Sequence, residues 1–534
     1  MRTKLETTPN AEEPEAGRTK LETTLVMSAL GLALFLAALD MTIITTAIAT
    51  ISSDLKSSQG YIWIGSAYLL GNSACVTIWG KVSDIFGRKP IILLAGATFF
   101  IGSLLCGLSK SMPMLIAARA IQGIGGGGLI VLPNICISDL FSMRNRGLYF
   151  GLLGGVWSIS SAVGPLLGGA ITSKATWRWC FYLNLPLTGV VMIILIFVLK
   201  LHNPKTPMKE GLLAIDWPGS VLVMGGTIML LLGLELGGVV YPWGSSTTIC
   251  LIVFGVLTIG AFLGYEARVA RYPLAPARLF DKSNSKAAYG LGFTHAFVFM
   301  SGSYWLPLYF QGVLGVSPLL SGVYLLPFVL SLSLVSMAVG IMIKKTGRYK
   351  IIIVAGTTVT VIGFALFTNL EPRANWAKII VYQIVAGVGV GPNFQAPLIA
   401  LQTNIDGRDI GAATSMFSFI RQIGTSISVH SKLERELGPD LADSLSGANA
   451  AANVQFVGSL TGEEGRIAKT AYWKSLQTMY IVYTCFAGLA LIISMFIQQV
   501  NLNKEHKEHK PGLASLRARK DDRPARGNEK ATDN

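Results

Sequence analysis

Apolar segments of about 20 residues recur along most of this chain, and short polar turns separate them. The hydrocarbon core of a bilayer is about 30 Å thick, so a helix needs about 20 apolar residues to cross it. Only 14% of the residues are charged, whereas soluble domains carry about a quarter. About fourteen membrane spans are therefore predicted, near 27–50, 61–82, 90–108, 113–138, 147–173, 180–200, 216–236, 248–266, 286–311, 318–343, 350–368, 376–401, 409–430 and 474–497.

The basic residues indicate the orientation, because cytoplasmic loops of membrane proteins carry an excess of lysine and arginine. Alternate turns of this chain are rich in lysine and arginine, whereas the opposite turns are poorer, and those near 237–247 and 312–317 contain neither residue. Both termini are therefore predicted to be cytoplasmic. The net charge of +15 is explained by these turns and tails, so we expect no nucleic-acid partner.

Motifs that recur with the same spacing indicate two related halves. GKVSDIFGRKPII begins at Gly80 and GIMIKKTGRYKII begins at Gly340, and Gly-Arg follows at the same offset in both. We predict an all-α polytopic membrane protein with two six-helix bundles and an extra pair of spans between them. The expected parts are a disordered tail at 1–24, bundles at 25–200 and 286–497, the extra pair at 201–285, an outer loop at 431–473 and a disordered tail at 498–534.

Charged side chains inside apolar spans are costly and usually functional, and two of those in this chain are the strongest candidates. Asp40 is in the first span and Arg119 is in the fourth. Desolvation disfavours the charged form of a carboxyl group, so Asp40 could exchange a proton as its exposure changes. We predict that Asp40 is the proton-coupling group and that Arg119 is its partner. A permanently paired carboxylate is the alternative.

The fifth span contains Gly164-Pro165 and Gly168-Gly169, which disturb a helix and let another backbone come close. We predict a closely packed hinge there, with simple helix packing as the alternative.

Polar and aromatic side chains of several spans could line a wide apolar cavity. Such a lining suits hydrophobic or cationic solutes through buried area and cation–π contacts, although packing explains any single one of them. The candidates are Gln122, Asn134, Trp157, Tyr304, Trp305, Tyr309, Gln311, Asn393, Gln395 and Arg421. The sequence has neither a P-loop nor an HExxH motif. We therefore expect no enzymatic activity, no metal and no cofactor. Transport is expected to be passive or to be driven by an ion gradient.

These motifs resemble those of the major facilitator superfamily and, within it, the fourteen-span drug:proton antiporter family. The resemblance implies that Asp84 and Arg88 lock and release an inner gate, and that the fourth-span motif with Arg119 takes part in proton transfer. The matching residues are Gly80, Asp84, Gly87, Arg88 and Lys89 in the cytoplasmic loop motif, Leu39, Asp40 and Thr42 in the first span, Arg119, Gln122 and Gly123 in the fourth, and Gly151, Gly164, Pro165, Gly168 and Gly169 in the fifth-span antiporter motif. Trp177-Arg178-Trp179, with Phe181, Asn184 and Pro186, is also similar to that branch.

The resemblance implies a transporter that exports hydrophobic or cationic small molecules in exchange for protons by alternating access. The loops and tails resemble those of filamentous-fungal efflux pumps, whose substrates include azoles, other xenobiotics and secondary-metabolite toxins. The expected partners are a small-molecule substrate and the lipid bilayer, and the protein is expected to work as a monomer in the plasma membrane. A vacuolar proton-coupled transporter of basic amino acids and a non-transporting membrane sensor are the alternatives.

Overall fold

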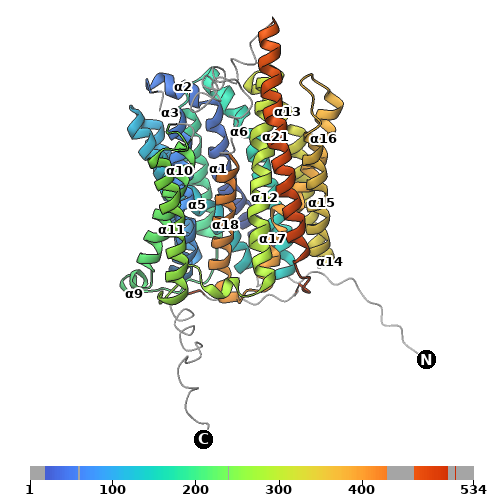
Figure 1. Cartoon of the computed structure of the whole chain (residues 1–534). Coiled ribbons are helices and arrows are strands. Elements are labelled where there is room, and N and C mark those ends of the chain that lie inside the picture. Colours follow the sequence, from blue (N-terminus) through green and yellow to red (C-terminus); the bar gives the residue numbers. More distant parts are fainter. Residues whose placement is uncertain (1–18, 58–59, 238–239, 430–461, 503–510, 513–534) are drawn as a thin grey trace, which may run out of the picture.

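The computed structural model describes residues 19–57, 60–237, 240–429, 462–502 and 511–512. The named elements of these residues are helices, most of which run side by side in one bundle (Figure 1). Eleven of the described helices are long and apolar enough to cross a membrane. This confirms the all-α polytopic fold. The count of fourteen spans also needs α3, α12 and α18, which are 27, 26 and 20 residues long, and it stays a prediction.

The N-terminal half begins earlier than expected. Helix α1 starts at Lys20, inside the stretch predicted as a tail, because Thr19 and Glu22 form a capping box that satisfies free N–H groups. The elements of this half are α1 (Lys20–Ile43), η2 (Ile44–Thr46), α2 (Ile48–Asp54), α3 (Gly60–Phe86), α4 (Arg88–Leu108), α5 (Met112–Leu140), α6 (Met143–Lys174), α7 (Trp179–Tyr182) and α8 (Asn184–Val198).

The C-terminal half differs from the N-terminal half in one broken helix. Where α5 runs through Pro133 without a break, its counterpart is divided into α16 and α17 by the turn η5. The elements are η3 (Ala277–Phe280), α12 (Ser283–Leu308), η4 (Tyr309–Val313), α13 (Pro318–Tyr324), α14 (Leu326–Thr346), α15 (Lys350–Phe367), α16 (Trp376–Val390), η5 (Gly391–Phe394), α17 (Ala396–Gln402), η6 (Gly407–Asp409), α18 (Ile410–Val429) and α21 (Gly462–Met495).

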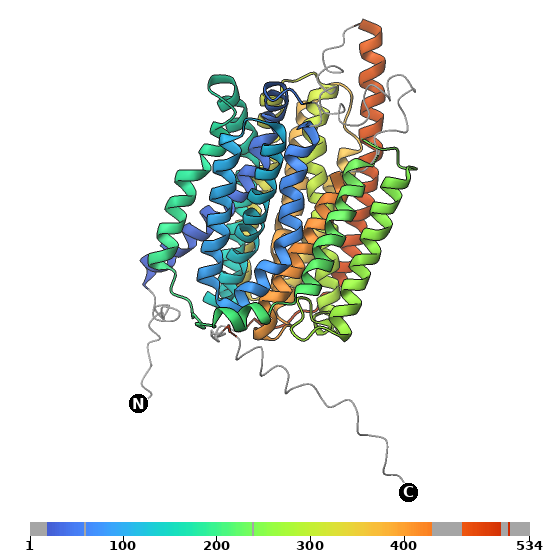
Figure 2. The same cartoon turned by 90° about the vertical axis from the view of Figure 1, so that its left-hand side faces the viewer.

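The predicted outer loop 431–473 is wrong at its C-terminal end, where helix α21 begins. The helix starts at Gly462, within the expected loop 431–473, and it projects beyond the rest of the bundle (Figure 2). The remainder of that loop, the repeated heptapeptide of the N-terminal tail and most of the C-terminal tail lie outside the described residues.

The extra elements between the halves are α9 (Met208–Leu213), α10 (Trp217–Leu236) and α11 (Ser246–Arg268). Helix α10 packs against α11 and also against α3 and α18, one from each half. Ser66 of α3 donates a hydrogen bond to Glu235 of α10, and Lys81 Nζ donates to the carbonyl of Pro273 at 3.0 Å. The extra pair therefore covers one side of the junction between the two halves.

Candidate functional site

A buried polar cluster lies where α1, α5 and α8 meet. Asp40 is 0% exposed. Its Oδ2 accepts a hydrogen bond from Arg119 Nη1, and the two side chains form an ion pair. Its Oδ1 accepts hydrogen bonds from Gln122 Nε2 at 2.8 Å and from Asn184 Nδ2 at 2.9 Å. Every bond that holds this carboxylate therefore comes from within the N-terminal half.

The guanidinium of Arg119 is equally well held. Its Nε donates to the carbonyl of Ile64 at 3.0 Å, and its Nη1 also donates to Gln122 Oε1 at 2.7 Å. The guanidinium carbon lies 4.5 Å from the centroid of the Tyr68 ring, within the range of a cation–π contact. A buried charge pair of this kind is tolerated because each partner neutralises the other and further hydrogen bonds satisfy both.

The structure brings together the predicted residues Asp40, Arg119 and Gln122. Two further residues belong to the cluster. Asn184 matches the family motif, but no role was predicted for it, and Ser103 accepts a hydrogen bond from Gln122 at 2.8 Å. Neither addition stands out in the sequence, because uncharged polar residues are common in membrane helices and pairing depends on packing. The Asp40 carboxylate therefore joins α1 to α5 and α8 through buried hydrogen bonds.

The loop motif forms a second charged cluster at the basic end of the bundle. Gly87, with φ at 95°, connects α3 to α4 in a conformation that favours glycine. Arg88 pairs with Asp84 at 2.5 Å and, through Nε, with Asp139 at 2.7 Å. Asp139 was not predicted. Lys89 is half-buried and donates to the carbonyl of Ile196, away from this cluster.

Glycines bring the two halves into backbone contact at the same end of the bundle. A Cβ atom on Gly80 of α3 would overlap the side chain of Ser415 of α18. A Cβ atom on Gly340 of α14 would lie 2.6 Å from the carbonyl oxygen of Gly147 and 3.1 Å from Cα of Gly151, both of α6. The two glycines that mark the internal repeat therefore lie at equivalent contacts between the halves, which we call the seam.

Hydrogen bonds close the seam at this end. Arg146 Nη1 donates to Gln402 Oε1 at 3.0 Å, and Gln402 Nε2 donates to Ser138 Oγ at 2.8 Å. Arg144 Nε donates to the carbonyl of Lys344 at 2.7 Å. Asp84 lies against Gly411 at the start of α18, where a side chain would overlap it. The conformation described here is therefore closed at the end that carries the basic turns.

The antiporter-motif glycines of α6 contact two different helices. Gly151 faces α14 across the seam, whereas Cβ atoms on Gly164 and Gly168 would overlap Thr42 and Ile43 of α1. Pro165 lies inside α6, which continues to Lys174. One end of α6 therefore contacts α14 of the opposite half, and the other end contacts α1 close to Asp40 and also α13 of the opposite half.

The matched sequence after α6 joins the outer ends of two elements. Trp177 Nε1 donates to Asp54 of α2 at 2.9 Å, and Arg178 Nη1 donates to the same oxygen at 3.3 Å. The hydrogen bond from Trp177 holds the pKa of Asp54 below its ordinary value, because it stabilises the carboxylate. These contacts hold the end of the first span in place.

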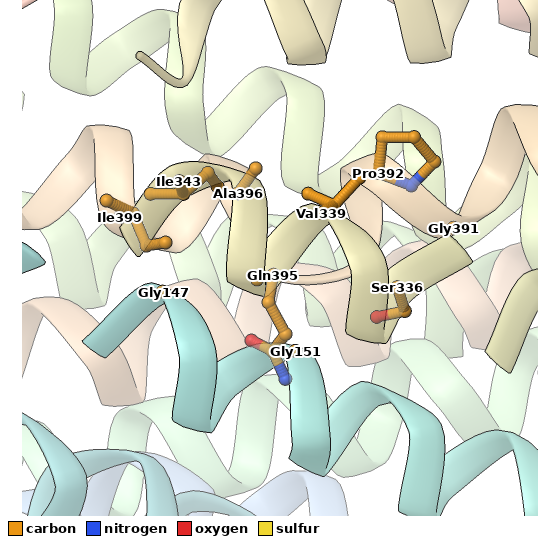
Figure 3. A pocket seen from close by; sticks show the side chains of 11 residues that line it. Gly147, Gly151, Ser336, Val339, Ile343, Gly391, Pro392, Gln395, Ala396 and Ile399 are labelled. Atoms are coloured by element: carbon orange, nitrogen blue, oxygen red, sulfur yellow. The ribbon is translucent and has the colours of Figure 1, made fainter. Parts of the chain in front are cut away.

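A small cavity lies between α6, α14 and the break between α16 and α17 (Figure 3). Its lining includes Gly151, Ser336 and Gln395, and the Gln395 side chain points toward Gly151. The volume is about 10 Å³, which is about the room that one water molecule needs. Drug-sized ligands occupy pockets of about 300 Å³ or more, so this cavity is not a substrate site in the closed conformation.

The predicted lining residues do not gather in one place. Trp157 and Arg421 both contact the Phe394 ring, at 6.3 Å and 4.7 Å. Gln395 lines the small cavity between the halves, and Gln122 belongs to the Asp40 cluster. The remaining candidates pack within a single half, and the role of the whole set as a lining stays a prediction. Their contacts are Trp305 to the Tyr483 hydroxyl at 2.8 Å, Tyr309 to the Glu371 carbonyl at 2.6 Å, Tyr304 edge-on to Trp305, Gln311 to Ser321, Asn134 to the Ile130 carbonyl, and Asn393 against Gly356.

The contact at Gly80 gives a test of the seam. We expect Gly80→Ala to lower the transport rate, because the added methyl group overlaps Ser415 whenever the basic end closes. Overpacking costs about 1–3 kcal/mol, which lowers the closed population by about 5- to 150-fold. Gly80→Ala combined with Ser415→Gly should recover much of the rate in a transport assay with reconstituted protein. Equal rates for the single variant and the wild type would show that this contact does not limit transport.

Two helical halves that meet across a glycine seam, with a buried ion pair in one of them, define a multi-pass membrane transporter. The chain belongs to the Major Facilitator Superfamily, whose sequence profile matches residues 30–429.

Proteins of similar sequence are named as fungal efflux pumps and transporters, and solved structures of transporters share the fold. The chain is 48% identical to the efflux pump dotC of Dothistroma septosporum, over 92% of this chain and 86% of that protein. It is 46% identical to the MFS-type transporter ppz2 of Metarhizium majus, over 96% and 91%. The human organic anion transporter MFSD10 (TETRAN) has a TM-score of 0.57 at 14% identity, covering 89% of this chain and 100% of its own. The proton:xylose symporter XylE has a TM-score of 0.57 at 13% identity, covering 94% and 99%. At such identities the structural likeness shows the fold alone.

Proposed function

We propose that this chain is a proton-coupled antiporter that exports a hydrophobic small molecule by alternating access. The observation that carries the proposal is the Asp40–Arg119 pair, which is buried in one half and tied to α6, the helix that forms the seam. The names of the fungal relatives, which are efflux pumps, support export as the direction.

In the proposed cycle, the proton is the species that moves in the direction opposite to the substrate. A proton taken up on the Asp40 carboxylate removes its negative charge, which weakens its hold on Arg119. Thr42 lies two positions after Asp40 and contacts Gly164, so a shift of α1 acts on α6. Helix α6 contacts α14 at its other end, which lets the same shift loosen the basic end of the seam. Substrate then enters from the basic side, and the proton leaves on that side.

The rest of the proposal follows from this cycle. The basic end faces the cytoplasm, the proton gradient supplies the energy without a cofactor, and one chain in the plasma membrane is sufficient. Imaging of a tagged chain at the cell surface or at the vacuolar membrane tests the location.

Reconstituted protein tests the coupling. We expect purified protein in liposomes with an imposed pH gradient to move a fluorescent lipophilic compound against its concentration, and each addition of substrate to dissipate part of the gradient. Collapse of the gradient with a protonophore should reduce this movement to that of protein-free liposomes. Uphill movement that survives the protonophore would exclude proton coupling, and no response to any compound would favour a sensor.

A further inference from the structure

The interior of this bundle holds a second cation, Arg421 of α18. The side chain is half-buried, and none of the described residues of α18 from 411 to 428 is exposed, so this helix lies inside the bundle. Arg421 lies over the Phe394 ring at 4.7 Å and donates from Nη1 to the Phe394 carbonyl at 3.2 Å. That carbonyl belongs to η5, the turn that separates α16 from α17 in the twelfth predicted span.

Among the described residues no carboxylate pairs with Arg421. Its contacts are the Phe394 carbonyl and the rings of Phe394 and Phe417. A guanidinium has five N–H donors, so most of its donors have no partner here. A charge inside a membrane bundle is costly unless an anion or a polar ligand compensates for it. Arg119 is compensated by Asp40, whereas Arg421 is not.

The surroundings of Arg421 extend across the seam. The Phe394 ring also contacts Phe299 at 5.4 Å, His295 at 6.0 Å and Trp157 at 6.3 Å, and Trp157 belongs to α6 of the opposite half. In transporters of this architecture, sites at the junction of the halves and beside broken helices change access as the halves move. This aromatic group therefore spans the junction between the two halves, beside the break between α16 and α17.

A further polar atom of this group lacks a partner in the described part of the chain. His295 is 5% exposed, and its Nε2 bonds the Val390 carbonyl at 3.0 Å, so Nε2 carries the proton. Its Nδ1 is then an acceptor, and it has no hydrogen-bond partner. A buried acceptor of this kind is costly unless a water or a ligand hydroxyl satisfies it.

We infer that the substrate is an aromatic organic anion, a carboxylate or a phenolate, whose charge binds Arg421 and whose rings stack on the Phe394 group. This inference rests on the proposed export function and narrows its substrate. The motifs left both hydrophobic and cationic substrates open. A lipophilic cation would meet an uncompensated positive charge here, and Arg421 already covers a face of Phe394. Asp40, the carboxylate inside the N-terminal half, is neutralised by Arg119.

Two dyes with the same ring system and opposite charge test this. Fluorescein, loaded into cells as its diacetate, is an anion, and rhodamine 123 is a cation on the same xanthene skeleton. We expect cells that express the wild type to export fluorescein faster than rhodamine 123. Arg421→Gln should lower fluorescein export about tenfold or more, because loss of one partner of a buried charge pair is costly. Arg421→Lys should retain part of it, because the charge remains while the planar fork is lost.

Controls separate this inference from the export function. Arg373→Gln removes an equal charge at an exposed position between α15 and α16 and should leave both dyes unaffected. Export of rhodamine 123 but not of fluorescein would support the export function and would contradict the inference that the substrate is an anion. An equal loss of both dyes in Arg421→Gln, at equal surface amounts, would also overturn it. If neither dye is exported and purified protein binds neither by fluorescence polarisation, both proposals fail.

Discussion

Asp40→Asn should abolish transport driven by a pH gradient, because the amide cannot take up the proton that the cycle needs. The substitution also leaves Arg119 buried without a carboxylate, and breaking a buried pair in this way costs about 3–5 kcal/mol. Reduced activity alone would therefore not separate a coupling role from a folding defect. The measurement is substrate-dependent dissipation of a pH gradient in proteoliposomes, at matched amounts of folded protein.

Removal of both charges separates these two effects. Asp40→Asn combined with Arg119→Gln leaves no uncompensated charge, so the thermal stability should recover toward that of the wild type while coupling stays absent. Ser103→Ala is the matched control, because it removes one hydrogen bond to Gln122 without changing the charge. It should cost about 1 kcal/mol and keep the coupling. Gradient-driven transport by the double variant would show that another group carries the proton.

The sequence was sufficient to predict the ion pair because charges inside apolar runs are rare and need partners. Asp40 and Arg119 are recognisable for that reason, 79 positions apart. Asn184 and Gln402 are not, since uncharged polar residues occur throughout membrane helices and their partners are set by packing. Asp139 lies at a helix end, where a solvated carboxylate is the ordinary expectation, and only the fold places it against Arg88.

The spacing of the motifs was sufficient to predict the internal repeat, but not which helices pack against the repeated residues. Gly80 and Gly340 occupy equivalent positions in the two halves, yet only the structure shows which helix faces each of them. Pro133 and Pro397 also correspond in sequence. The first lies within a continuous helix, whereas the second is at the start of α17 after a turn. Pro397 is in the first turn of α17, where its missing N–H costs no helical hydrogen bond, and the turn before it contains a second proline, Pro392, where the first half has Gly128.

Gly340→Val should prevent closure of the basic end and reduce transport more than Gly80→Ala does. The Cβ atom would meet the backbone of α6 at Gly147 and Gly151, and a backbone cannot move aside as a side chain can. A cost of about 3 kcal/mol or more lowers the population of the conformation closed at the basic end by about 100-fold or more. Transport in proteoliposomes should fall accordingly, and the protein should remain folded because it can rest in the conformation open at the basic end.

A cysteine at Ile399 reports that conformation directly. Ile399 is 1% exposed and lines the small cavity between α6, α14 and α17, so Ile399→Cys should resist a membrane-impermeant maleimide in the closed state. In a background with the exposed Cys250 and Cys485 replaced by serine, Gly340→Val should expose it to maleimide from the basic side. Gly189→Val is the matched control, because nothing lies within 4 Å of a Cβ atom at Gly189 of α8. If Gly340→Val protects Ile399→Cys as well as Gly189→Val does, closure does not depend on the α6–α14 contact, and the seam is not the gate.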